Sequence, residues 1–260
     1  MRFFLLALTA LLLAACASGP QFNDSFHSSS QSSRVQYVVV HYTSTDLAHS
    51  LALLTRGEVS SHYLIADDNP ATIYRLVDEN RRAWHAGQSE WQGRTWLNAS
   101  TIGIEIVNPG YEDTPQGRVW QPYSEAQITA LIDLLKDIVQ RHQLPLDSII
   151  GHSDVAPQRK DDPGPLFPWQ RLAEAGLIRW PDSHEVASEQ AVFASNLPAP
   201  HWFQEQLARL GYATPQTGVL DAATRRVLVA FQMKYRPARF DGEADAQSAA
   251  ILAVLNRMPR

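Results

Sequence analysis

The stretch that most constrains the fold of this chain is Gly151–Pro165, with the sequence GHSDVAPQRKDDPGP. It is too rich in proline and glycine for a helix or a strand, so it predicts a loop. The short apolar run Ser148–Ile150 directly before it predicts a strand, which puts His152 where that strand ends. A side chain in that position can face a cleft, which is a common place for a metal ligand or a catalytic group.

A second histidine also follows a predicted strand. The β-branched run Val35–Val40 is long enough for a buried strand and leads into His41. Further strands are predicted at Ser61–Ile65, Thr72–Val77 and Thr101–Val107. In the last of these, three isoleucines alternate with Gly103 and Glu105, so a carboxylate stands in a strand with no apolar reason for it. Taken alone, Glu105 fits an ordinary solvent-facing glutamate. It becomes a candidate catalytic residue only together with His41 and His152.

Capping residues and apolar spacing predict the helices. In the first part of the chain they lie at Leu47–Arg56, from Ser124 to near His142, and at Trp169–Ala175. Residues 181–200 lose this periodicity and predict a linker. Three more helices, which predict a compact domain over residues 201–260, lie at His201–Leu210, Ala222–Tyr235 and Ala246–Asn256. Nothing in that domain has catalytic spacing, so it predicts a packing or interaction module.

The segment Arg81–Asn98 is rich in tryptophan and has no helical or strand period. Aromatic rings on a loop suit a groove that stacks on sugars or packs against a peptide. The alternative is that Trp84, Trp91 and Trp96 fill the core beneath the loop. The sequence leaves both interpretations open.

The N-terminus predicts a targeting segment. The apolar run Phe3–Leu13 is too short to span a bilayer but has the length of the hydrophobic region of a signal peptide. It leads into Ala-Ala-Cys16, which resembles a bacterial lipobox. We therefore expect residues 1–16 to be a lipoprotein signal peptide and Cys16 to carry the lipid. The alternative is an ordinary signal peptide with an incidental cysteine.

The serine-rich residues 17–33 predict a flexible tether. Ala17 stands where an aspartate would indicate inner-membrane retention, so the lipobox resemblance implies an anchor in the outer membrane, with the protein facing the periplasm. Cys16 is the only cysteine, which excludes a disulfide framework and a cysteine-based zinc site. A formal net charge of -5 with no basic run gives no footprint of nucleic-acid binding.

Two imidazoles and one carboxylate form a ligand set for catalytic zinc. The sequence offers this set in His41, His152 and either Asp161 or Asp162. A hydrolytic site also needs a proton acceptor and a positive group facing the developing oxyanion, which Glu105 and Lys160 would supply. From spacing alone, each histidine fits a core residue equally well, and Lys160 fits a solvated loop lysine.

The chain carries four segments, in the expected order, that resemble the zinc-dependent N-acetylmuramoyl-L-alanine amidases of the type-2 family: VVVHYTS, RAWHAGQSEWQGR, STIGIEIVN and GHSDVAPQRKDDPGP. This family shares its fold with peptidoglycan recognition proteins. The resemblance implies that residues 34–180 form an α/β domain with a mixed central β-sheet flanked by helices. Residues 201–260 resemble a small three-helix peptidoglycan-binding domain, but the glycine-rich segment of that domain is degraded here at Thr217–Asp221.

The resemblance implies a role for each site residue. Zinc (Zn2+) would be held by His41, His152 and Asp162, the aspartate directly before Pro-Gly-Pro. Asp161 would then be a turn or surface residue. Glu105 would take the proton of the attacking water, and Lys160 would stabilise the oxyanion. Substrate contacts are expected from Trp84, His85 and Tyr42, whereas His62 would be structural.

The activity that the resemblance implies is hydrolysis of the amide between N-acetylmuramic acid, or its 1,6-anhydro form, and L-alanine of the stem peptide, in cell-wall turnover. The partners would be peptidoglycan or muropeptides and, through the lipid, the outer membrane. The alternative is a non-catalytic peptidoglycan-recognition protein or a lipoprotein that tethers the wall. Non-catalytic members of the superfamily usually lack a zinc ligand, whereas this sequence has all three.

Overall fold

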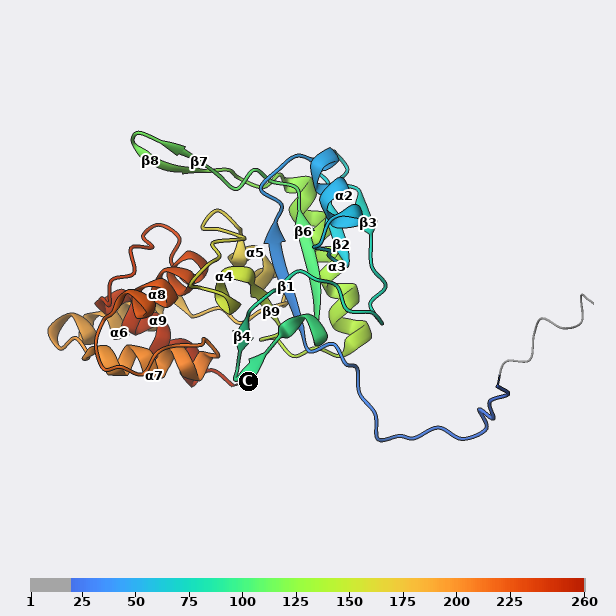
Figure 1. Ribbon diagram of the computed structural model, residues 1–260. Helices are drawn as coiled ribbons and strands as arrows, with labels where there is room; N and C mark the ends of the chain where they lie inside the picture. The colour runs from blue at the N-terminus through green and yellow to red at the C-terminus, as the bar shows by residue number, and fades with distance from the viewer. Residues whose placement is uncertain (1–19, 260) are drawn as a thin grey trace, which may run out of the picture. The chain divides into compact units, whose positions relative to one another are not determined.

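The computed structural model describes residues 20–259 (Figure 1). The predicted signal peptide and its Cys16 lie outside the described residues. Residues 20–32 contain no helix or strand, their side chains are exposed, and they belong to a separate unit from the one that begins at Ser33. Across the described part of the chain, no helix is both long enough and apolar enough to cross a membrane.

The main unit is built on a mixed five-stranded sheet in the order β3, β2, β6, β1, β9. These strands are β1 (Tyr37–Tyr42), β2 (Tyr63–Ile65), β3 (Ile73–Arg75), β6 (Thr101–Ile106) and β9 (Ile149–Gly151). β1 runs parallel to β6 and β9, β2 runs parallel to β6, and the edge strand β3 pairs antiparallel with β2. Parallel strands are covered on both faces, which is why β1 reads as a continuous apolar run. The predicted mixed sheet is confirmed.

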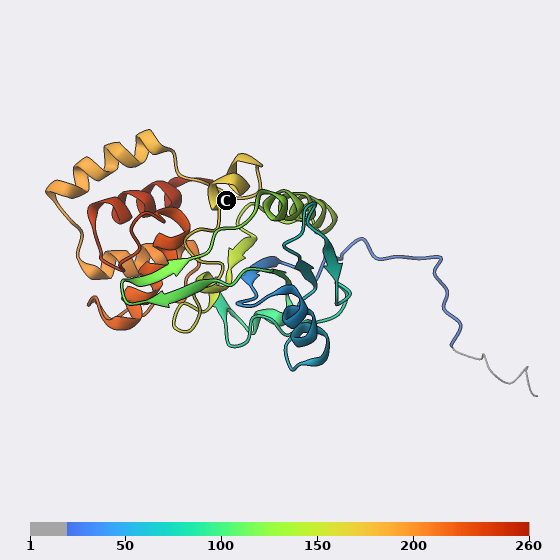
Figure 2. The same ribbon diagram turned by 90° about the horizontal axis from the view of Figure 1, so that it is seen from above.

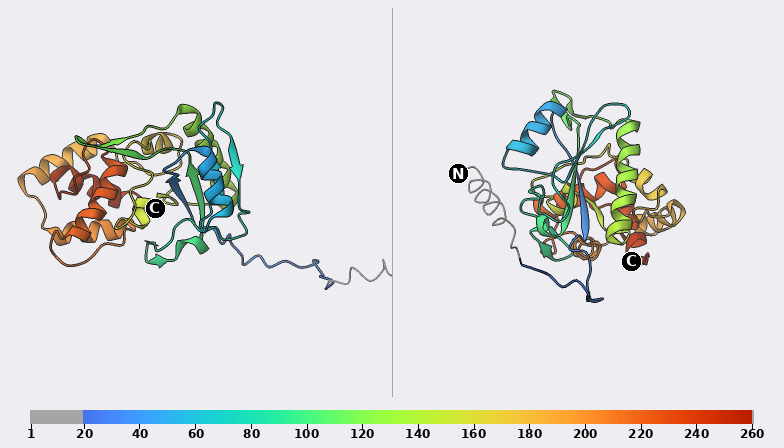
Figure 3. Two further views of the ribbon diagram at one scale, coloured as in Figure 1. Left: turned by 45° about the horizontal axis from the view of Figure 1, so that its top comes forward. Right: turned by 90° about the vertical axis from the view of Figure 1, so that its right-hand side faces the viewer.

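One face of the sheet packs against α3 (Glu125–His142) and α5 (Trp169–Glu174). α3 begins at the predicted capping box, where Ser124 Oγ accepts a hydrogen bond from Gln127 N and Gln127 Oε1 accepts one from Ser124 N. The buried apolar stripe of α3 lies on this face: Ile128, Leu131, Leu135 and Ile138. Figure 3 shows α3 along one side of the sheet and α2 (Leu47–Arg56) on the other. α2 packs there on Leu64 and Val107.

The other face of the sheet shares its core with a C-terminal helical module. This module consists of α6 (Ser183–Ser195), α7 (Pro200–Leu210), α8 (Ala222–Tyr235) and α9 (Ala246–Arg257). Val39 of β1 and Ile150 of β9 belong to one buried cluster with Phe203 and Phe231 of this module. Because successive residues of a strand point to opposite faces, Val38 and Val40 face the α3 side while Val39 faces the module.

Most of the segment predicted as a linker, residues 181–200, forms helix α6, which lies beside α9 (Figure 2). Asp182 caps this helix by accepting hydrogen bonds from His184 N and Glu185 N. None of its residues is buried, so it has no apolar stripe to reveal it in the sequence.

Two short hairpins and one helical turn were also not predicted. The hairpins are β4 (Glu90–Trp91) with β5 (Arg94–Thr95) and β7 (Tyr111–Thr114) with β8 (Gly117–Trp120), and the 3-10 helix Leu97–Ala99 follows β5. The segment expected to be loop throughout, Gly151–Pro165, contains the one-turn helix α4 (His152–Val155). Asp154 Oδ2 accepts a hydrogen bond from Gly151 N and so caps this turn. The proline and glycine content of the segment gave no indication of a helix.

Candidate active site

Three side chains from separate elements converge at one edge of the sheet. His41 lies near the carboxyl end of β1, His152 begins α4 directly after β9, and Asp162 lies on the loop that follows. Nδ1 of His41 is 2.8 Å from Nδ1 of His152, and Oδ2 of Asp162 is 3.0 Å from each nitrogen. Because β1 and β9 are parallel neighbours, their carboxyl ends meet at the same edge.

The cluster fits a divalent cation such as zinc. Its three donor atoms form a triangle of nearly the size expected for tetrahedral zinc, whose ligands are about 3.3 Å apart when each bond is about 2.0 Å. Burial, together with the neighbouring His152, lowers the pKa of His41 to about 4. Burial would raise the pKa of Asp162, but His152 and His41 outweigh it and hold that pKa well below its usual range. A neutral imidazole and a charged carboxylate are the forms that bind metal.

Glu105 stands beside this cluster because β1 and β6 pair with His41 opposite Glu105. Burial raises the pKa of the Glu105 carboxyl well above its usual value, the charge of Asp162 raises it further, and Lys160 offsets part of the rise. Among the described residues, Glu105 Oε2 is buried and has no hydrogen-bond partner. An unpaired carboxylate oxygen with a raised pKa is suited to accept a proton.

His85 lies behind His41 and is held at both ring nitrogens. Its Nδ1 is 3.0 Å from His41 Nε2, and its Nε2 is 3.0 Å from Thr101 Oγ1. Thr101 Oγ1 donates in turn to the carbonyl oxygen of Leu97 at 2.8 Å. Since that carbonyl only accepts, the chain runs one way: Thr101 accepts from His85 Nε2–H, and His85 Nδ1 accepts from His41 Nε2–H. This leaves His41 Nδ1 with the lone pair that a metal needs.

This chain of hydrogen bonds was not predicted from the sequence. His85 was expected to contact substrate, and it lines the pocket. In addition, both of its ring nitrogens are engaged by the protein, and the bond to His41 orients that ring. Gly103 makes room for the ring, because a Cβ at Gly103 would lie 2.4 Å from His85 Cγ. His62 is buried and structural as expected, and its Nδ1 accepts from Gly103 N at 3.0 Å.

The cluster opens into a pocket of about 190 Å³. Of the residues singled out in the sequence, its lining contains the three clustered side chains together with Tyr42, Trp84, His85, Glu105 and Lys160. Trp84 is half exposed, and the guanidinium of Arg82 lies 4.1 Å from its ring centroid. Asp161 turns away and forms an ion pair with Arg118 at 2.8 Å, as expected for the surface residue of the Asp-Asp pair.

The sequence matches a family model described as N-acetylmuramoyl-L-alanine amidase over residues 31–165. It is also 42% identical to the N-acetylmuramoyl-L-alanine amidase AmiD of Escherichia coli over 268 residues, which cover 98% of this chain and 97% of AmiD. The chain belongs to the N-acetylmuramoyl-L-alanine amidase family. It is accordingly an enzyme, an amidohydrolase that acts on muropeptides, so the non-catalytic alternative is excluded.

A second family model, described as putative peptidoglycan binding domain, matches residues 196–252 of this amidase. Two solved structures agree with the fold over both parts. A complex of E. coli AmiD with anhydro-N-acetylmuramic acid-L-Ala-D-gamma-Glu-L-Lys has a TM-score of 0.82 at 40% identity, covering 91% of this chain and 94% of the other. AmpDh3 of Pseudomonas aeruginosa in complex with anhydromuramic pentapeptide has a TM-score of 0.84 at 39% identity, covering 92% and 98%.

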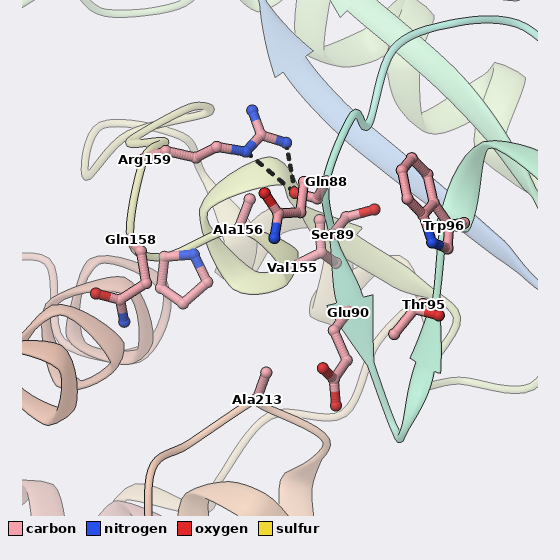
Figure 4. Close-up of a pocket in the computed structure, with 11 residues that line it drawn as sticks. Gln88, Ser89, Glu90, Thr95, Trp96, Val155, Ala156, Gln158, Arg159 and Ala213 are labelled. Carbon is pink, nitrogen blue, oxygen red and sulfur yellow. Dashed lines mark hydrogen bonds between the residues drawn. The ribbon is translucent and has the colours of Figure 1, made fainter.

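The amidase has a second, larger pocket of about 490 Å³, which includes Arg159 in its lining (Figure 4). Its lining comes from the segment around β4 and β5, from the end of α4, and from the helical module: Gln88, Ser89, Glu90, Thr95, Trp96, Val155, Ala156, Pro157, Gln158, Arg159 and Ala213. Arg159 lines this pocket, and its Nε and Nη2 donate to the carbonyl oxygen of Gln88 at 3.0 and 2.7 Å. The same guanidinium contacts His152 Nε2 at 3.3 Å.

The three tryptophans of Arg81–Asn98 therefore divide between the two interpretations. Trp91 is buried in the core shared with the helical module, where its ring meets that of Tyr212 edge-on at 4.9 Å. Trp84 lines the pocket of the cluster, and Trp96, which is 72% exposed, lines the larger pocket. Burial of Trp91 depends on α7 and α8, which lie more than a hundred residues away in the sequence, so local pattern could not identify it.

Proposed function

We propose that this amidase is a zinc enzyme that cleaves the amide between the lactyl group of N-acetylmuramic acid, including its 1,6-anhydro form, and L-alanine of the stem peptide. The observation that carries the proposal is the convergence of His41 Nδ1, His152 Nδ1 and Asp162 Oδ2 in one pocket with the unpaired carboxylate of Glu105. AmiD and AmpDh3, which bind anhydromuramic peptides in their solved complexes, support the substrate class.

The metal and the protein residues have separate tasks. When bound, zinc supplies Lewis acidity, which polarises the scissile carbonyl and acidifies the attacking water. Glu105 accepts the proton of that water and then passes it to the departing nitrogen of L-alanine, a shuttle that suits its raised pKa. Lys160, in the wall of the same pocket, faces the negative charge that develops on the carbonyl oxygen. The products are a free stem peptide and a lactyl carboxylate on the sugar.

We propose that the two halves of the substrate occupy the two pockets. Trp96 offers an exposed ring face, and the amides of Gln88 and Gln158 offer donors and acceptors, which is the combination that holds a saccharide. We assign the larger pocket to the saccharide half and the pocket containing Trp84 to the stem peptide. The scissile amide then lies beside the loop from His152 to Asp162.

Metal removal tests the reaction. Stem peptide released from purified anhydromuramic peptide is quantified before chelation, after chelation and after zinc is restored. We expect activity to be lost on chelation and regained with zinc, and Asp162→Ala to stay inactive under all three conditions. Asp161→Ala is the matched control, since it removes the adjacent carboxylate, which pairs only with Arg118 in this region, and should keep its activity. Full activity in the metal-free protein would refute the proposal.

We further propose that Cys16 carries a lipid that anchors the protein in the outer membrane, facing the periplasm. The support is the sequence Leu-Ala-Ala-Cys after an apolar run, followed by the serine-rich residues 17–33. Fractionation of a Gram-negative host that expresses the full chain should recover the amidase with outer membranes, and Cys16→Ser should abolish incorporation of labelled fatty acid. Equal labelling of both proteins would exclude Cys16 as the site of the lipid.

A further inference from the structure

A buried ion pair joins the helical module to the segment that carries the metal ligands. Lys234 lies on α8 but is only 5% exposed, and its Nζ is 3.0 Å from Asp154 Oδ2. The same Nζ donates to the carbonyl oxygen of Ile149 at 3.4 Å and lies 4.2 Å from the ring centroid of Trp169. Lys234 therefore connects the helical module to α4 and β9, next to the candidate metal ligand His152.

Asp154, on the other side of this pair, is 1% exposed and has every acceptor engaged. Its Oδ1 accepts from the hydroxyl of Tyr212, also in the helical module, at 2.7 Å. Its Oδ2 accepts from Lys234 and from Gly151 N. Removing one partner of such a buried ion pair lowers the stability of the fold, whereas the intact pair adds little net stability. We therefore look for its role in the local backbone conformation that it fixes.

Asp154 belongs to α4, a helix that spans only His152–Val155 and begins with the metal ligand His152. A single turn does not hold its shape without outside contacts, because the first turn of a helix costs more conformational entropy than its hydrogen bond returns. Asp154 supplies those contacts two residues from His152. The neighbouring Ser153 N donates to the carbonyl oxygen of Asp162 at 2.7 Å, so the same turn also fixes the second ligand on this loop.

We propose that Lys234 and Tyr212 are positioning residues for the metal site. Through Asp154 they hold α4 at the orientation in which His152 Nδ1 meets His41 Nδ1 and Asp162 Oδ2. The helical module is then a structural part of the amidase centre in addition to any contact that it makes with the cell wall. This inference rests on the proposed zinc site, and it concerns the affinity for the metal as well as the reaction.

A second buried cation, Arg179, which contacts the helical module from the amidase part, provides a matched control. Arg179 is 9% exposed and pairs with Asp147 of the same part at 2.6 Å, while its Nη1 donates to the carbonyl oxygens of Leu255 and Met258 in and after α9. It fastens the helical module to the amidase part without contacting α4. Removing it should loosen the interface but leave the metal ligands in place.

The experiment measures the zinc dissociation constant of the full chain by competition with a chromophoric chelator, together with the melting temperature of each metal-free protein. The variants are Lys234→Met, Tyr212→Phe and the control Arg179→Met. We expect the dissociation constant to rise about tenfold in Lys234→Met and by a smaller factor in Tyr212→Phe, as is typical when a group that orients a metal ligand is removed. Arg179→Met should lower the melting temperature with little change in zinc affinity.

Tyr212→Phe keeps the test decisive if Lys234→Met does not fold, since it removes a single hydroxyl. Unchanged zinc affinity in a folded Lys234→Met and in Tyr212→Phe would overturn the positioning role while leaving the zinc proposal intact. An equal loss of affinity in Arg179→Met would also overturn it, because the effect would then come from the interface as a whole. A native chain that binds no zinc would overturn the proposed function itself, and the positioning role with it.

Discussion

The close approach of Gly103 to His85 makes a quantitative prediction about the core of the site. In Gly103→Ala, the new Cβ would lie 2.4 Å from His85 Cγ and 2.7 Å from Cδ2 and Nδ1. Relaxed carbon contacts are about 3.5 to 4.0 Å, so the overlap exceeds about 1 Å. The backbone cannot yield, since β6 pairs with β1 on one side and β2 on the other. The ring cannot yield without breaking its contacts with His41 and Thr101.

We therefore expect Gly103→Ala to lower the free energy of unfolding by about 3 kcal/mol, at the upper end of the usual cost of overpacking. For a chain of this size, that corresponds to a fall in melting temperature of about 6 to 12 °C. The measurement is urea denaturation of the metal-free protein, which separates packing from metal binding.

A double-mutant cycle with His85→Ala identifies the cause. Removing the ring removes the three atoms nearest to the new Cβ. The higher strand propensity of alanine should then make the substitution neutral or stabilising by up to about 1 kcal/mol. The two costs should therefore be coupled by about 3 kcal/mol. Additive costs, with Gly103→Ala equally destabilising in both backgrounds, would refute the steric explanation.

Three further predictions concern proton transfer, saccharide binding and acid stability. Glu105→Gln keeps the shape of the side chain but cannot accept a proton, so kcat for peptide release should fall by about 10² to 10⁴ while zinc content stays unchanged. Trp96→Ala should raise KM several-fold for muropeptides and leave kcat nearly unchanged, as measured by initial rates over a range of substrate concentrations. Burial opposes ionisation of Glu79, but hydrogen bonds from Arg141 and Tyr63 outweigh it and lower its pKa from 4.5 to about 2. The folded-state pKa is the lower one, so this contribution to stability is complete above pH 4.5 and is lost as the pH falls towards 2. The difference in unfolding free energy between the native chain and Glu79→Gln should shrink over that range.

Much of the site could be predicted because its residues stand at ends of regular elements. His41 follows a buried strand, Glu105 interrupts an alternating strand, and His152 follows the strand before a polar loop. The resemblance to the amidase family selected Asp162 over Asp161, and in the structure Asp162 joins the cluster while Asp161 pairs with Arg118. Amphipathic helices such as α3 were predictable for the same reason, since one-sided burial leaves a periodic pattern.

What the sequence could not show depends on packing between distant segments. α6 buries none of its residues and has no periodic stripe. The hydrogen bonds of His85 could not be predicted either, because its partners, His41 and Thr101, approach it only after β1 and β6 have paired. The same holds for Lys234, which reads as an ordinary surface lysine of α8 until the helical module packs on α4.

Residue types and their order along the chain were therefore enough to predict the donor atoms of this amidase and the strand ends and loop that carry them. Tertiary structure alone decided how those donors are held. The orientation of His41 comes from His85 and Thr101, and the orientation of His152 comes from Asp154, which is fixed from the helical module. The physical reason is that local sequence encodes backbone periodicity, whereas buried hydrogen bonds and ion pairs join residues whose distance is set only when the whole chain has packed.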